Sequence, residues 1–327
     1  MVRLSRSEDA TVHVVCANHA LDRLLVVPRF RPSAVNRAVR VEVLAGGKGV
    51  IVCRAARRLG PAVAVHGFVG GAVGELVRQE CRALGAADRN TPIDGETRTT
   101  TVVIDEHTGR STVVNERGPH IRAEDLDALY ARLSAELRPG DVVVATGSLP
   151  DGAPPDFHAR IGRIALDRGS VPLVDAADEA LAATIANLER APAAMVLKVN
   201  ADELAAVTGT TVDDLGPTMG RVHSGTGSSV VVTRGELGAI WRSQDRRIRV
   251  GSPCVETVNA TGSGDCFLAG LAVAIGRGQD PRDAMVLASA MGAANAASLT
   301  PDVDPDLVRR LAARVGADES WGDGAGR

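Results

Sequence analysis

In Val258-Asn-Ala-Thr-Gly-Ser-Gly-Asp-Cys-Phe-Leu-Ala-Gly270, a glycine-rich turn runs directly into an apolar, alanine-rich segment that predicts a helix. The first turn of a helix presents unpaired N–H groups, with the positive end of the helix dipole behind them, and phosphate binds there readily. The carboxylate of Asp265 would repel an anion that the turn merely holds. Its presence makes sense if it accepts a proton from a hydroxyl that attacks the phosphoryl group held by the turn. The stretch therefore indicates phosphoryl transfer, although an isolated turn of this kind is more often a plain helix start.

The composition is that of a globular protein, long enough for one large α/β domain or two ordinary ones. Of its 327 residues, 45% are hydrophobic and only 2% are aromatic, so we expect a core of valine, leucine, isoleucine and alanine. The net charge of −3 gives no electrostatic reason to expect nucleic acid or an anionic membrane as a partner. The polar start, Met1–Asp9, has no signal-peptide core, and no apolar run reaches the roughly 18 residues of a membrane span.

The cysteines and lysines narrow the setting further. The five cysteines are scattered and never spaced C-x-x-C, which fits a reducing cytoplasm and argues against a disulfide framework or a zinc site. Only two of the 37 basic residues are lysines, Lys48 and Lys198, and a coding bias toward arginine would produce this. They lie in Gly46-Gly47-Lys48-Gly49 and Lys198-Val199-Asn200, settings typical of ligand sites, and a compact ammonium binds phosphate as a point charge.

Strand-like and helix-like runs alternate through most of the chain. The strand pattern of Val63–His66 precedes a helix pattern over Gly74–Leu84, and Val142–Ala145 precedes Pro155–Asp167. This order predicts a three-layer α/β/α sandwich with a mostly parallel central sheet, whose ligand sites lie at the carboxyl ends of the strands.

Two segments, residues 24–44 and 97–115, break this alternation. Both are rich in β-branched residues with turn signals and no intervening helix, and the second predicts a hairpin. Together they predict a small projecting β-sheet, which would act as a lid if it lies near the active edge. We expect one domain over residues 1–315 and a disordered, glycine-rich tail over residues 316–327.

Two motifs, Gly46–Gly49 and Asn259–Asp265, together resemble the signatures of the ribokinase-like (PfkB) carbohydrate kinases. The resemblance covers about residues 11–297. Five shorter stretches are similar to the branch of 1-phosphofructokinase and tagatose-6-phosphate kinase: Asn18–Asp22, Val35–Arg37, Gly95–Arg98, Asn115–Pro119 and Thr146–Pro150. The resemblance implies a ribokinase-like fold and a kinase that uses ATP and Mg²⁺ to phosphorylate a hydroxyl of a small, already phosphorylated acceptor.

The resemblance also implies roles for individual residues. Asp265 matches the catalytic base, and the anion hole for the transferred phosphoryl group is matched by the backbone amides of Gly262, Ser263, Gly264 and Asp265. The nucleotide-binding positions of the family are matched by Lys198, Thr233, Gly235, Gly264 and Asn295. The acceptor-binding positions are matched by Asp22, Gly46, Gly47, Lys48 and Arg98. Asn200 and Glu203 match an N-x-x-E element that orders Mg²⁺ through its waters, although Glu203 also suits an ordinary helix start.

The chain departs from the family pattern chiefly where sugar hydroxyls are bound. Ile51 and Thr100 stand where the family usually has asparagine, and Asp175–Asp178 replaces a D-x-S-G stretch without its glycine. A pocket whose polar groups do not match a substrate's hydroxyls discriminates against that substrate. We therefore expect a phosphorylated acceptor, with a less polar ring such as a deoxy sugar phosphate or a cyclitol phosphate of secondary metabolism as an alternative. In relatives the lid sheets often pair across a dimer, and the β-rich segments here permit a homodimer.

The sequence argues against two other functions and leaves a third open. Dinucleotide binding would need G-x-G-x-x-G spacing, which Gly67–Gly74 lacks. A serine hydrolase would need a G-x-S-x-G context, which Ser148 and Ser263 lack. A non-catalytic sugar-phosphate sensor on the same fold stays open, because a fold alone does not specify function.

Overall fold

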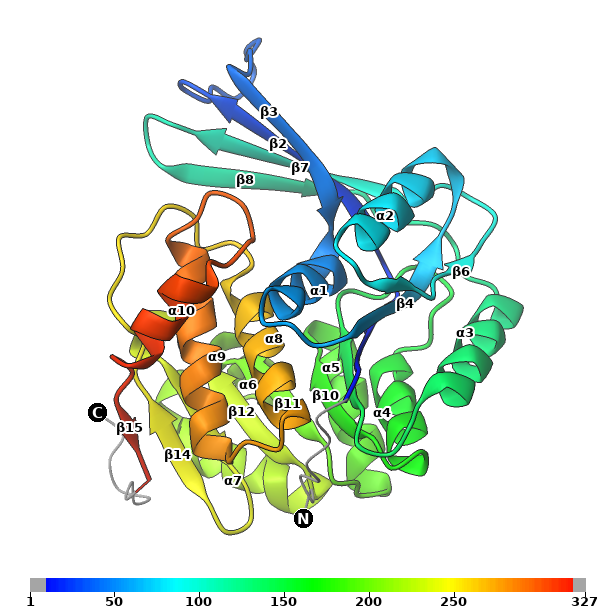
Figure 1. Ribbon diagram of the computed structural model, residues 1–327, viewed down its shortest axis with the longest axis vertical. Coiled ribbons are helices and arrows are strands. Elements are labelled where there is room, and N and C mark those ends of the chain that lie inside the picture. Colours follow the sequence, from blue (N-terminus) through cyan, green and yellow to red (C-terminus); the bar gives the residue numbers. More distant parts are fainter. Residues whose placement is uncertain (1–9, 320–327) are drawn as a thin grey trace.

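The computed structural model describes residues 10–319, and its strands form a large central sheet and a separate small one (Figure 1). Across the central sheet the strands follow the order β15 (Ala317–Asp318), β14 (Arg247–Val250), β13 (Ala239–Arg242), β12 (Ser229–Thr233), β11 (Val196–Asn200), β10 (Val171–Asp175), β9 (Val142–Thr146), β1 (Val12–Cys16), β4 (Val63–Val69) and β5 (Ala87–Asp88). The short β6 (Thr91–Pro92) pairs with the end of β4. From β12 to β5 the pairing is parallel, whereas β13, β14 and β15 are antiparallel.

Helices cover both faces of this sheet, each over its own hydrophobic cluster. One face carries α1 (Gly47–Arg58), α2 (Gly71–Ala83), α8 (Ser263–Gly276), α9 (Pro281–Ala296) and α10 (Pro305–Ala312). The other carries α3 (Ala123–Glu136), α4 (Phe157–Asp167), α5 (Asp178–Arg190), α6 (Ala201–Thr208) and α7 (Leu215–Thr226). Val12 and Val14 of β1 belong to the first cluster and Val15 to the second, as expected of a strand buried on both sides. The predicted three-layer sandwich is thus confirmed.

The small sheet has the order β3 (Arg40–Gly46), β2 (Ala20–Val27), β7 (Arg98–Asp105) and β8 (Arg110–Asn115). It projects from the body at the top of Figure 1, above the helices of the first face. The two segments predicted to form it do so, although β2 begins at Ala20, four residues before the predicted start. β2 follows β1 after three residues, and β3 runs directly into α1, so the small sheet is joined to the site through short connections.

The prediction of a disordered tail from residue 316 is wrong for its first residues. Ala317 pairs with Val250 at the edge of the central sheet, because β14 offers an open row of backbone groups there. The rest of that tail, residues 320–327, and the polar start, Met1–Asp9, lie outside the described residues. None of the helices within residues 10–319 has the length and apolarity that crossing a bilayer requires.

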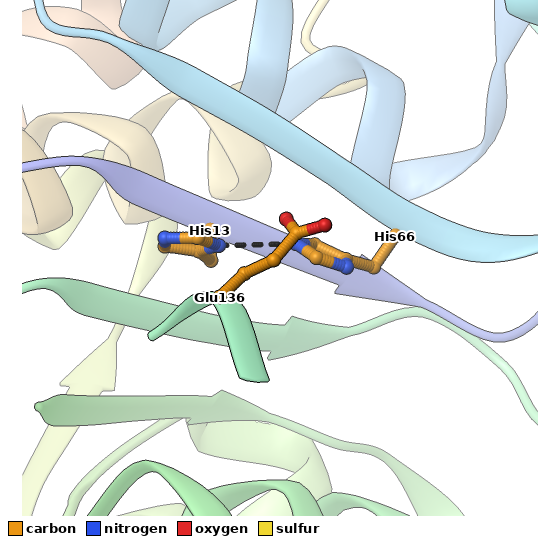
Figure 2. Close-up of side chains that lie close together, drawn as sticks. All are labelled: His13, His66 and Glu136. Atoms are coloured by element: carbon orange, nitrogen blue, oxygen red, sulfur yellow. Dashed lines mark hydrogen bonds between the residues drawn. The ribbon is translucent and has the colours of Figure 1, made fainter. Parts of the chain in front are cut away.

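At the amino-terminal end of the sheet, the buried side chains of His66, His13 and Asp141 form a chain of polar contacts. The hydrogen bond between His13 Nδ1 and His66 Nε2, drawn as the dashed line in Figure 2, is 3.0 Å long. His13 Nε2 lies 3.4 Å from Asp141 Oδ2. The Glu136 carboxylate beside the two rings pairs with Arg89 at 2.9 Å. Burial lowers the pKa of His66 well below its ordinary value, and the nearby cations lower it further. His66 is therefore neutral, and these contacts connect β4 and β1 with Asp141, the residue directly before β9.

Candidate active site

The carboxyl ends of the central strands bring polar side chains into one row. Asp175 ends β10, and the parallel register pairs it with Thr146 at the end of β9 and with Lys198 in β11. Residues paired in register point to the same face of a sheet, here the face covered by α1. Lys48, the second residue of α1, reaches this row from the helix layer on that face.

Both lysines of the chain bind the one carboxylate of Asp175. Lys48 Nζ lies 3.2 Å from Oδ2 and Lys198 Nζ lies 3.1 Å from Oδ1, while Thr146 Oγ1 donates to Oδ2 at 3.0 Å. The side chains of Asp175 and Lys198 are buried, whereas that of Lys48 is 39% exposed. Burial alone would raise the pKa of Asp175, but Lys198 and Lys48 outweigh it and lower that pKa, and Asp175 in turn raises the pKa of Lys48. Asp175 and Lys48 are therefore both ionised at neutral pH.

Asp265 lies in the first turn of α8 and is 7% exposed. Burial raises the pKa of Asp265 to about 7; the charge of Asp175 acts in the same direction, and the charges of Lys48 and Lys198 oppose it. A carboxyl with such a pKa is substantially ionised at neutral pH and is basic enough to accept a proton from a hydroxyl.

The turn before Asp265 is held in a left-handed conformation. Gly262 caps α8 with φ +84°, a value that strains any residue with a side chain. The N–H of Ser263 donates to Ala260 O at 3.1 Å, so this amide of the predicted anion hole is already bonded. The amides of Gly264 and Asp265 lie in the first helical turn, where a helix offers no carbonyl partner, and they stay suited to bind an anion.

Asn295 of α9 supports this turn from behind. Its side chain is 1% exposed and donates to Thr261 O at 2.9 Å and to Ser263 Oγ at 3.1 Å. Because the side-chain amide of Asn295 is bonded to the turn, this placement does not favour the predicted direct contact between Asn295 and a nucleotide. The bonds instead fix the turn before any ligand arrives.

A cavity of about 540 Å³ lies beside the turn, and Ser263 and Gly264 form part of its wall. Its other lining residues are mostly small or apolar and include Thr233, Gly235, Cys254, Ser289, Gly292 and Ala296. The volume lies in the range of cofactor and ligand pockets. Three of the predicted nucleotide-binding residues, Thr233, Gly235 and Gly264, thus line a cavity of suitable size, and Lys198 lies next to Gly264.

The predicted acceptor-binding residues meet at the base of the small sheet. Asp22 of β2 lies against Gly46, where a Cβ would overlap its carboxylate, and Gly47 has φ +74°. Arg98, the first residue of β7, donates to Asn18 O at 3.4 Å. Burial raises the pKa of Asp22, while the charge of Arg98 opposes this rise. The charge of Arg98 therefore acts on the ionisation of Asp22.

The predicted metal-binding pair, Asn200 and Glu203, forms a capping box at the start of α6. Asn200 Oδ1 accepts from the Glu203 N–H at 2.7 Å, and Glu203 Oε2 accepts from the Asn200 N–H at 3.0 Å. The structural role of the pair is therefore present. These bonds use one oxygen of the Glu203 carboxylate, and the charge of Glu203 contributes to the raised pKa of Lys48. The pair fits a hard cation held through water, because a second carboxylate oxygen stays available.

Asp175 and Thr146 were not among the predicted site residues, although they join the two lysines. Both directly end a buried strand at the carboxyl edge of the sheet, where α/β proteins bind ligands. That position was the signal in the sequence that could have identified them.

A buried carboxyl with a raised pKa at a helix start, a glycine turn suited to an anion and a cavity beside that turn, all at the carboxyl edge of a parallel sheet, are features typical of phosphoryl-transferring enzymes. The model of the pfkB family carbohydrate kinases matches residues 12–302. The chain belongs to this family and is a carbohydrate kinase, as its resemblance to the family implied.

Curated relatives and solved structures agree with this assignment. A tagatose-6-phosphate kinase of Staphylococcus epidermidis strain ATCC 12228 is 28% identical over 283 residues, which cover 85% of this chain and 90% of the relative. A putative phosphofructokinase of Staphylococcus aureus shares 27% identity with a TM-score of 0.79, over 95% of this chain and 99% of that one. Phosphofructokinase-2 of Escherichia coli in complex with fructose-6-phosphate has a TM-score of 0.85 at 22% identity, over 93% and 99%, and shows the shared fold.

Proposed function

We propose that this kinase transfers a phosphoryl group from ATP to a hydroxyl of a phosphorylated sugar or sugar-like acceptor. The observation that carries the proposal is the placement of Asp265, a buried carboxyl with a pKa of about 7. It directly follows Gly264, which lines the cavity, and it lies within electrostatic range of Asp22 on the acceptor side. A base between two such sites suits transfer from one bound molecule to the other.

The chemistry follows from these positions. The acceptor hydroxyl gives its proton to the Asp265 carboxylate while its oxygen attacks the terminal phosphorus of ATP, and ADP leaves with the electrons of the broken P–O bond. Negative charge on the phosphoryl oxygens is stabilised by the amides of Gly264 and Asp265, by the α8 dipole and by the ammonium of Lys198. Because Asn295 fixes the turn in advance, little reorganisation accompanies the step.

A nucleotide–metal complex fits the other half of the site. The apolar wall of the cavity suits an adenine ring, and Lys198 suits the phosphates. Glu203 and Asn200 would hold Mg²⁺ through its waters, and the cation when bound would neutralise charge on the nucleotide phosphates.

On the acceptor side, Lys48 and Arg98 supply separate cations for the phosphate that the acceptor already carries, and Asp22 accepts from a ring hydroxyl. Ile51 supports a second candidate, an acceptor with a less polar ring such as a cyclitol phosphate. Its side chain is 6% exposed, and its methyl groups lie 3.5–3.6 Å from the place of a Cβ on Gly262, so apolar surface borders the phosphoryl turn. A hydroxyl at this position would lose a hydrogen bond.

The small sheet would act as a lid and as a dimer interface. Several valines of this sheet and its connecting loop are exposed: Val35, Val39, Val41, Val43, Val113 and Val114. Exposed apolar side chains and two open edge strands favour pairing with a second copy. Light scattering should give twice the chain mass, and a Val41→Glu/Val43→Glu variant should halve it; a monomeric wild type would refute the dimer.

The function is tested by ADP release against matched acceptors. The panel pairs tagatose 6-phosphate, fructose 6-phosphate, fructose 1-phosphate and an inositol phosphate with their unphosphorylated parents. We expect turnover only with phosphorylated members, because the parents leave Lys48 and Arg98 without an anion. Equal turnover of the parents would overturn the phosphorylated-acceptor proposal. Fructose 1-phosphate used as efficiently as by a dedicated glycolytic kinase would overturn the inference from Ile51.

A further inference from the structure

The two lysines assigned above to different substrates share one carboxylate, that of Asp175. We propose that Asp175 is a positioning residue that holds Lys48 and Lys198 as a coupled pair. Each lysine binds the phosphate of one substrate, and the position of each lysine depends on the position of the other lysine. The proposal rests on the proposed function, since it takes Lys48 to serve the acceptor and Lys198 the nucleotide.

The geometry allows Asp175 to hold both lysines while they work. Each lysine binds its own carboxylate oxygen, Lys198 at Oδ1 and Lys48 at Oδ2. An ammonium has three N–H donors, so one bond to Asp175 leaves two for a phosphate. Thr146 donates to the same carboxylate and fixes its rotation about the end of β10. Asp175 can thus stay bound throughout turnover.

The two lysines reach this carboxylate from the two parts of the site that are assigned to different substrates. Lys198 points at the phosphoryl turn, because a Cβ on Gly264 would lie 3.3 Å from its Nζ. Lys48 comes from the start of α1, directly after Gly46 and Gly47, where the acceptor residues meet. One buried carboxylate therefore joins the nucleotide side to the acceptor side.

Coupling follows from the charges. Two ammonium groups and one carboxylate leave a single net positive charge for the incoming phosphates. If Lys48 is removed, Asp175 keeps only Lys198 as a counter-ion and attracts it more strongly, because a buried charge needs a partner. Nucleotide binding should therefore weaken when an acceptor-side lysine is lost. A carboxylate that only stabilised the fold would not produce this effect.

The first test compares Asp175→Asn with Asp178→Asn, a matched control three residues further on that is exposed in the first turn of α5. We expect Asp175→Asn to weaken MgADP binding, measured by calorimetry, and to raise the acceptor KM, each by about tenfold, within the range of couplings between neighbouring charges. The acid limb of kcat/KM should also move to lower pH, since the Asp175 charge and that of Asp22 raise the pKa of Asp265 while Lys48 and Lys198 lower it. A variant that only melts earlier, with both affinities and the pH profile unchanged, would overturn the proposal.

The second test leaves Asp175 in place, and so it still decides the matter if Asp175→Asn does not fold. Lys48→Met should weaken MgADP binding by about threefold or more in the absence of any acceptor, whereas Arg58→Met, at the far end of the same helix, should not. Unchanged MgADP affinity in Lys48→Met would overturn the coupling. If the wild-type chain bound no MgADP, the proposed function would fall and this inference with it; if wild type binds and Lys48→Met binds equally, only the inference falls.

Discussion

The two ends of the central sheet both bury ionisable groups, but they satisfy them differently. At the amino-terminal end, Asp141 accepts from the N–H groups of Thr11 and Arg138 and faces His13, which in turn bonds to His66. At the carboxyl-terminal end, Asp265 takes part in none of the ion pairs found within residues 10–319. At the first end the buried carboxylate of Asp141 has three polar partners, whereas at the second end Asp265 has no ion-pair partner among the described residues.

This difference separates stability from reactivity. A buried polar group with partners stabilises the fold, whereas a buried carboxylate without a partner destabilises it and becomes a base at neutral pH. The two ends should therefore respond in opposite ways to the same chemical change, an aspartate replaced by asparagine.

The largest effect is expected at Asp265. Asp265→Asn should lower kcat by about 10²–10⁴-fold, because the general base is lost while MgADP binding stays. Asp283→Asn, an exposed acid in the first turn of α9, is the matched control and should keep full activity. A protein that senses rather than phosphorylates sugar phosphates would have no turnover for the substitution to remove.

The same variant should melt at a higher temperature than the wild type at alkaline pH. Because the folded pKa of Asp265 is about 7 and its ordinary value is 3.8, the wild type loses stability as the pH rises between these values. The gain of Asp265→Asn should be absent below pH ~4 and reach up to ~4 kcal/mol above pH ~7. Thermal melts at several pH values measure this, and a variant less stable at pH 8 would contradict it.

Asp141→Asn should do the reverse. We expect a loss of about 2–3 kcal/mol of unfolding free energy with unchanged kcat/KM, since charge-assisted bonds are lost far from the chemistry. Burial would raise the pKa of Asp141, but bonds from His13, Thr11 and Arg138 outweigh it and lower that pKa. This stabilisation is therefore present above pH ~4 and is lost on further acidification. The exposed Asp167→Asn in α4 is the control, and a fall in activity without a fall in stability would break the comparison.

The pH profile of the wild type tests the contrast without a mutation. With a base of pKa about 7, kcat/KM should be half-maximal near pH 7 and fall about tenfold for each pH unit below it. A profile that stays flat down to pH 5 would show that Asp265 is not the titrating base.

The smallest effect is expected at Gly264. A methyl group there would lie 3.3 Å from Lys198 Nζ, so Gly264→Ala should displace the ammonium and raise the ATP KM by up to about tenfold. Gly276→Ala, at the other end of α8, has only ordinary contacts and should leave KM unchanged while stabilising the helix slightly. Equal kinetics in the two variants would show that Lys198 has no close role at the turn.

The outline of the fold and the reacting turn could be predicted from local patterns. The alternation of strands and helices, the two small-sheet segments and the glycine turn at Gly262–Asp265 are readable within short windows of sequence. The helices at Asp178–Arg190 and Leu215–Thr226 were not predicted; the second contains a proline and three glycines, which blur a helical pattern.

The contacts that organise the site were beyond prediction for a different reason. Thr146, Asp175 and Lys198 come together through the register of three parallel strands separated by helices. That register depends on packing across the whole sheet, and no local spacing encodes it. The same holds for Asn295, whose bond to the turn depends on how α9 packs beside α8.

The short joints of the small sheet have a mechanical consequence. β2 carries Asp22 close to its root, β7 begins with Arg98, and β3 passes without a break into the helix turn that carries Lys48. If this sheet closes as the proposed lid, it would turn about these short connections, which lie at the proposed acceptor site. A small tilt of its far edge would shift all three side chains together, so covering the substrate and gripping it would be one movement.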